Sequence, residues 1–82
     1  MDKKQQILQQ VEQIFRKELN DESLQITFDS SANTVEQWDS INNLVLISAI
    51  EEQFNISFSI EVIFSANNVG DLINYIADNT SN

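Results

Sequence analysis

The chain has 82 residues, of which 41% are hydrophobic, and it carries a formal net charge of −9 at pH 7. This length fits one small domain, and this hydrophobic fraction is typical of a folded chain rather than a disordered one. The sequence contains neither cysteine nor histidine, which removes the disulfide framework, the thiolate nucleophile, the imidazole base and the usual zinc ligands. We therefore expect neither a self-contained enzyme nor a structural metal site.

The charges are unevenly distributed along the chain. All four basic residues lie between Lys3 and Lys17, and every acid except Asp2 and Glu12 lies from Glu18 onward. Such a surface repels phosphate backbones and anionic lipid headgroups, so we expect no nucleic-acid or membrane partner. It attracts basic patches on partner proteins, although acidity also serves simply to keep a small domain soluble.

No targeting or membrane segment is evident in the sequence. No apolar run approaches the ~20 residues that a membrane span needs. The charged start of the chain is not followed by the apolar segment of a signal peptide. We therefore expect a cytoplasmic protein, acting as a monomer.

The periodicity predicts a first amphipathic helix over residues 3–19. Its apolar residues recur at spacings of three and four: Ile7, Leu8, Val11, Ile14, Phe15 and Leu19. Residues 20–39 have no sustained period and predict a long loop, which is unusual in so small a domain and often functional. We expect Leu24, Ile26 and Phe28 to anchor this loop to the core, and Trp38 to pack it onto the helices.

The second predicted helix, residues 40–54, is the most apolar segment of the chain. Asp39 or Ser40 can cap its first turn, since both side chains accept hydrogen bonds from the free N–H groups there. Its apolar arc is wider than one core-facing stripe needs. Either this helix packs on several sides, or a stripe that includes Ile41, Leu44 and Val45 is kept for a partner.

Two more helices complete the prediction. Ser59 can cap a short helix over residues 60–64, and Asn68 can cap a last helix over residues 69–78. The inner stripe of the last helix consists of Val69, Leu72, Ile73 and Ile76. The fold class is therefore all-α, a four-helix bundle with a long first loop and a short third helix, in a single domain spanning residues 1–82.

Several of these residues resemble the acyl carrier protein family, in its stand-alone form. The similarity spans about residues 35–77 and combines the triplet Asp39-Ser40-Ile41 with the apolar helix behind it. It continues in Glu51, Glu52, Phe54 and Ile56, then in Val69, Asp71, Leu72, Tyr75 and Ile76. The triplet alone recurs by chance, and the specificity of the resemblance comes from the whole set.

The resemblance implies a function for Ser40, which is otherwise a simple helix cap. The resemblance implies that a phosphopantetheinyl transferase attaches a 4′-phosphopantetheine arm from coenzyme A to this serine, with Mg²⁺, and that Asp39 helps to place the cofactor. The arm's thiol then carries acyl groups as thioesters in lipid, polyketide or related biosynthesis. This fits a chain without cysteine or histidine, which borrows its thiol from a cofactor and its base from a partner.

The resemblance also implies a docking surface on the second helix. By position it comprises Ile41, Leu44, Val45, Glu51 and Glu52, and it faces acyl-activating, acyltransferase or ketosynthase enzymes that have basic patches. Leu44 and Val45 are equally compatible with the core, and the two glutamates with an ordinary solvated face. Fatty-acid carriers place acids two and five residues after the serine, where this chain has Asn42 and Val45.

Two other functions share the same sequence features. A carrier for aminoacyl or peptidyl groups in nonribosomal assembly has the same fold and serine, and the acidic surface leans weakly toward acyl cargo. A non-enzymatic adaptor that only docks partners through the second helix would not need Ser40 at all.

Overall fold

The computed structural model describes residues 2–31, 33–35 and 37–80. Four helices follow one another in the chain: α1 (Lys3–Glu18), α2 (Ser40–Phe54), α3 (Ile60–Ser65) and α4 (Val69–Asn79). Within the described residues there is no strand, so the predicted all-α fold with its long first loop and short third helix is confirmed. The bounds differ from the prediction at C-terminal ends only. Leu19, expected to be helical, is instead the C-cap of α1.

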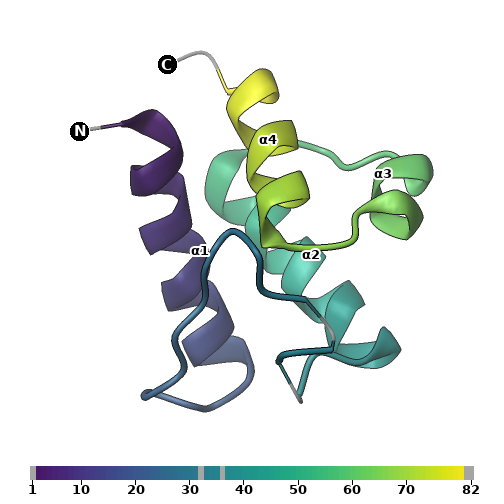
Figure 1. The fold of residues 1–82 in the computed structure, drawn as a ribbon. Helices are drawn as coiled ribbons and strands as arrows, with labels where there is room; N and C mark the ends of the chain where they lie inside the picture. Colours follow the sequence, from purple (N-terminus) through teal and green to yellow (C-terminus); the bar gives the residue numbers. More distant parts are fainter. Residues whose placement is uncertain (1, 32, 36, 81–82) are drawn as a thin grey trace.

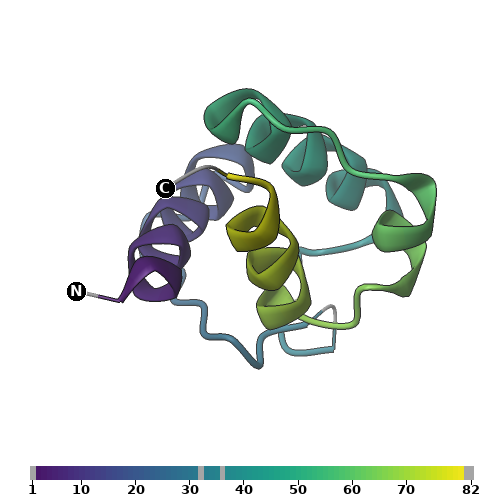
Figure 2. The ribbon, with the colours of Figure 1, turned by 90° about the horizontal axis from the view of Figure 1, so that it is seen from above.

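Helices α1, α2 and α4 surround a common core, while α3 lies to one side (Figures 1 and 2). Helix α1 runs alongside both α2 and α4, and the start of α1 lies at the same end of the molecule as the end of α4. None of the six residues of α3 is fully buried. The fully or almost fully enclosed core side chains are Phe15, Leu46, Ile50, Leu72, Ile73, Ile76, Val11 and Val69.

The apolar stripe of α1 turns inward as its spacing predicts. Ile7, Val11 and Phe15, at intervals of four residues, are its buried members. At the start of α1, the Lys3 ammonium donates to the carbonyl oxygens of Ala77 (3.1 Å) and Thr80 (3.2 Å). A cation at the carbonyl end of a helix satisfies its free acceptors, so Lys3 ties the start of α1 to the end of α4.

The first loop is fastened to α1 by a charged pair. The Arg16 Nε donates to the Leu24 carbonyl (2.6 Å), and the Ile26 N–H donates to the Glu12 carboxylate (3.1 Å). Arg16 and Glu12 also pair with each other, at 3.2 Å. The Leu24 carbonyl and the Ile26 N–H are therefore paired with side chains of α1, and Ile26 is buried in the core.

A second attachment joins the loop to the start of α4. The Val69 N–H donates to the Ser30 carbonyl and the Gly70 N–H to the Phe28 carbonyl, both at 2.8 Å. A Cβ at position 70 would lie only 2.9 Å from the Phe28 carbonyl oxygen. Gly70 is therefore needed for the close approach of two backbones, and the free N–H groups of the first turn of α4 serve as donors to the loop.

Trp38 completes the path of the loop to α2. Its indole is buried and meets the Phe15 ring edge-on, with ring centroids 5.2 Å apart and planes at 84°. Such edge-to-face pairs are favourable beyond the area that they bury. Trp38 therefore fixes the end of the loop to α1, as the sequence predicted, and the chain enters α2 two residues later.

Candidate functional site

The site begins at the first turn of α2. Asp39 is the N-cap, and its carboxylate Oδ1 accepts from the Ile41 N–H (3.1 Å) and the Asn42 N–H (2.8 Å). Of the two residues predicted as possible caps, Asp39 is therefore the one that caps α2. Ser40 is the first helical residue, and its side chain lies outside the described part of the structure. Both neighbours of Ser40, Asp39 and Ile41, are exposed, so the helix begins at the surface.

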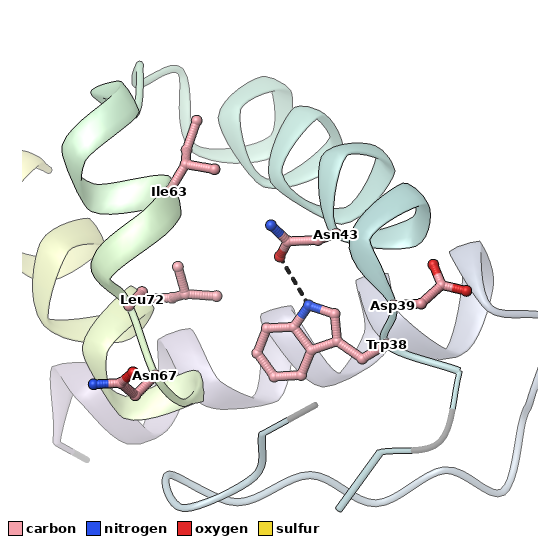
Figure 3. A pocket seen from close by; sticks show the side chains of 7 residues that line it. Trp38, Asp39, Asn43, Ile63, Asn67 and Leu72 are labelled. Atoms are coloured by element: carbon pink, nitrogen blue, oxygen red, sulfur yellow. Dashed lines mark hydrogen bonds between the residues drawn. The ribbon is translucent and has the colours of Figure 1, made fainter. Parts of the chain in front are cut away.

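A hollow of about 260 Å³ opens beside this turn (Figure 3). One side consists of Trp38 and Asp39, just before Ser40, and of Asn43, three residues after it. The other side is formed by Ile63 of α3, Leu72 of α4 and Asn67 in the link between these helices. The long loop and the short helix thus meet around a cavity adjacent to the predicted attachment residue.

One hydrogen bond orders the polar wall of the hollow. The Trp38 indole Nε1–H donates to the Asn43 side-chain oxygen at 2.8 Å (Figure 3). Because an indole nitrogen is a donor only, Asn43 must present its oxygen there and its amide nitrogen elsewhere. The sequence reasoning did not identify Asn43. The only available signal was that a buried tryptophan needs an acceptor within reach.

The outer face of α2 is apolar. Ile41, Leu44 and Val45 expose 75%, 60% and 43% of their surface, while Leu46, Ile47 and Ile50 on the opposite face are buried. The wide apolar arc thus combines a core face and a surface face. The three predicted docking residues lie together on the exposed side, with Ile41 one helical turn before the adjacent Leu44 and Val45.

Helix α3 contributes two exposed apolar side chains that the sequence analysis did not select. Ile60 and Phe64 expose 72% and 82% of their surface. They are four residues apart and so lie on one face of α3, whereas Val62 and Ile63 pack against the core. That spacing was the available signal, but six residues are too few to establish which side of a helix faces inward.

The two glutamates near the end of α2 have different surroundings. The Glu51 carboxylate is partly buried and accepts from the Phe58 N–H at 2.7 Å. Glu52 is exposed and lies on the same side of α2 as Val45 and Ser48. Glu51 thus holds the link between α2 and α3, whereas Glu52 is free to meet a partner.

We expect this difference to be measurable as stability. Glu51→Ala should lower the free energy of unfolding by about 1–3 kcal/mol, because it leaves the N–H of the buried Phe58 without its charged acceptor. Glu52→Ala, the matched control, should change it by no more than about 0.5 kcal/mol. Urea unfolding followed by circular dichroism measures both, and equal effects would contradict a structural role for Glu51.

Neither a cluster of metal ligands nor a membrane-spanning helix is found in the described part of the chain. Among the residues described, no three acidic side chains come together as metal ligands. No helix there has the length and hydrophobicity to cross a membrane.

Known proteins match this chain along most of its length. The family model described as "Phosphopantetheine attachment site" matches residues 9–76. An acyl carrier protein of Helicobacter pylori is 32% identical over 73 residues, which cover 89% of this chain and 94% of the relative. An acyl carrier protein of Cyanidium caldarium is 33% identical over 79 residues, which cover 96% and 92%.

A solved structure of an acyl carrier protein has a similar fold. The solution NMR structure of a holo acyl carrier protein from Geobacter metallireducens matches with a TM-score of 0.81 and 32% sequence identity. The match covers 87% of this chain and 82% of the other. On these grounds the chain belongs to the acyl carrier protein family, whose prosthetic group is phosphopantetheine.

Proposed function

We propose that Ser40 is the residue that carries the 4′-phosphopantetheine arm of this acyl carrier protein. The observation that carries the proposal is the place of Ser40, which begins α2 at the surface with a hollow of about 260 Å³ beside it. The positive end of the helix dipole favours the negative charge of a phosphodiester at this position. Because Asp39 already caps the helix, Ser40 is not needed for that purpose.

The chain is a carrier rather than a catalyst, and a transferase supplies the chemistry of attachment. The sequence has no histidine to take the serine proton, so the base belongs to the phosphopantetheinyl transferase. Asp39 is placed to assist. Its Oδ1 caps the helix, and among the described residues no hydrogen bond engages its Oδ2. That oxygen is available to the Mg²⁺ that accompanies coenzyme A.

The cargo is an acyl group in lipid, polyketide or related biosynthesis. The prosthetic group, when bound, supplies the thiol that this cysteine-free chain lacks. The residues of the chain contribute the attachment point, the hollow and the surface that partner enzymes meet. The acidic character of the chain from Glu18 onward favours acyl over aminoacyl cargo only weakly.

Partner enzymes dock on the outer face of α2. Ile41, Leu44 and Val45 supply exposed apolar area directly after Ser40, and Glu52 supplies charge at the far end of the same face. Apolar contacts stabilise an encounter complex, whereas acids accelerate its formation with a basic patch. Glu51 contributes to docking mainly by holding the link to Phe58 in place. This arrangement fits acyl-activating, acyltransferase or ketosynthase partners with apolar patches bordered by lysine and arginine.

Mass spectrometry tests the proposal directly. Co-expression of the wild-type chain with a broad-specificity phosphopantetheinyl transferase should add one phosphopantetheine to its mass, and fragmentation should locate the addition on Ser40. Ser48, which is exposed on the same helix, is the internal control and should stay unmodified. An unmodified protein, or an addition on another serine, would contradict the proposal.

A further inference from the structure

The hollow beside Ser40 combines apolar walls with one oriented hydrogen-bond donor. We propose that it binds a short acyl group with an acceptor oxygen along its chain, such as a 3-oxoacyl group, and that Asn43 selects this cargo. The inference rests on the proposed attachment at Ser40, and it adds a class of cargo and a specificity-determining residue.

The donor is the amide nitrogen of Asn43. Trp38 requires the oxygen of this amide as its acceptor, which fixes the amide plane and turns the nitrogen away from the indole (Figure 3). The nitrogen points to the side of the hollow where Ile63 lies. Among the described residues it donates to no protein acceptor. Trp38 itself is held by Phe15, so the donor is oriented before any cargo arrives.

The side chains that face this donor are apolar. Ile63 and Leu72 face Asn43 across the hollow, and the Trp38 ring closes one side (Figure 3). A saturated chain buried here would pack against the apolar walls but leave the Asn43 N–H groups without an acceptor, which is unfavourable in an apolar site. An acyl chain with a carbonyl oxygen beside Asn43 would pack against the same walls and also accept a hydrogen bond from the amide.

The volume limits the length of the cargo. An apolar cavity of about 150 Å³ holds a benzene molecule. At the same density, the 260 Å³ beside Ser40 holds roughly ten non-hydrogen atoms. The end of the arm and an acyl group of about four to six carbons fill that space, so the remainder of a longer chain would lie outside the hollow.

The test compares cargoes that differ only in the chain oxygen. A broad-specificity transferase moves the butanoyl or 3-oxobutanoyl phosphopantetheine group from the coenzyme A thioester to Ser40, with release of adenosine 3′,5′-bisphosphate, and intact mass verifies each loading. The rate at which each acyl group transfers to added 2-mercaptoethanol is then compared with the rate on free pantetheine. The ratio of the two rates is the protection that the hollow provides.

We expect 3-oxobutanoyl to be protected about fivefold more than butanoyl, because a ratio of this size corresponds to the net stabilisation by one hydrogen bond. Asn43→Asp keeps an acceptor for Trp38 but removes the donor, so it should abolish the difference. Asn67→Asp places the same charge at the exposed edge of the same hollow and should preserve it. In the wild type, the side-chain amide NMR signal of Asn43 should shift with 3-oxobutanoyl and not with the unacylated arm.

Several outcomes overturn the inference. Equal protection of the two cargoes in the wild type excludes selection by Asn43. A shift of the Asn43 signal caused by the unacylated arm would show that the Asn43 amide donates to the arm and not to the acyl group. Since the amide signal is read in the wild type, the test holds even when Asn43→Asp is unstable. Failure to load any cargo contradicts the attachment at Ser40, and the mass measurement distinguishes that case.

Discussion

The Ser40→Ala protein, co-expressed with a broad-specificity phosphopantetheinyl transferase, is expected to keep its unmodified mass while remaining folded. Loss of the hydroxyl removes the only atom of this side chain that can form the phosphodiester. The fold should tolerate the change, because Asp39 and not Ser40 accepts the hydrogen bonds of the first turn. We expect the free energy of unfolding to change by no more than about 0.5 kcal/mol. Intact mass and urea unfolding measure the two effects separately.

Ser48→Ala is the matched control for this experiment. Ser48 is exposed on the same helix, two turns after Ser40, so its variant should be modified as fully as the wild type. Modification of the Ser40→Ala protein would show that another hydroxyl is the attachment point. A Ser40→Ala protein that supports the pathway as well as the wild type would instead favour the adaptor that only docks partners.

The sequence was sufficient to predict the helices because each has an end signal, and α1 and α4 also have an apolar periodicity. The spacing of Ile7, Val11 and Phe15 predicted the buried face of α1, and Ser59 and Asn68 predicted the starts of α3 and α4. Ser59 accepts from the Val62 N–H and Asn68 from the Asp71 N–H. These signals are local, since they depend on residues within one or two turns of each other.

The path of the long loop is set by interactions that the sequence does not reveal. Leu24, Ile26 and Phe28 were predicted as anchors, but their partners come from residues distant in the chain. Gly70 meets the Phe28 carbonyl and Glu12 meets the Ile26 N–H. The loop has no period of its own, so only the packed fold determines which donors and acceptors face it.

The candidate site was also only partly predictable from the sequence. The position of Ser40 at the start of an apolar helix was predictable from its neighbours in the chain. The hollow was not, because four of its seven lining residues, Ile63, Ala66, Asn67 and Leu72, come from α3, α4 and the link between them. Likewise, the apolar arc of α2 left open whether Leu44 and Val45 were core or surface. The exposed fractions of 60% and 43% place both on the surface.

The largest effect on stability is expected for Phe15→Ala. Phe15 is completely buried and supports the Trp38 ring at a centroid distance of 5.2 Å, so truncation removes a large buried ring and leaves a cavity. Phenylalanine-to-alanine changes in cores cost about 3–5 kcal/mol. A chain of this size has a total stability of roughly 4–12 kcal/mol at 0.05–0.15 kcal/mol per residue. We therefore expect the variant to be marginally folded at 25 °C, and urea unfolding measures the loss.

Trp38 is the single tryptophan, so its fluorescence measures the effect of Phe15→Ala at the site. Without the Phe15 edge, the indole should become more accessible to water, and its fluorescence emission should shift to longer wavelength even in the protein that remains folded. Ile41→Ala is the control. That side chain is 75% exposed and no farther from Ser40, and it should leave stability within about 0.5 kcal/mol. An unchanged emission in folded Phe15→Ala protein would show that the Asn43 hydrogen bond alone holds Trp38, and that the hollow beside Ser40 does not depend on α1.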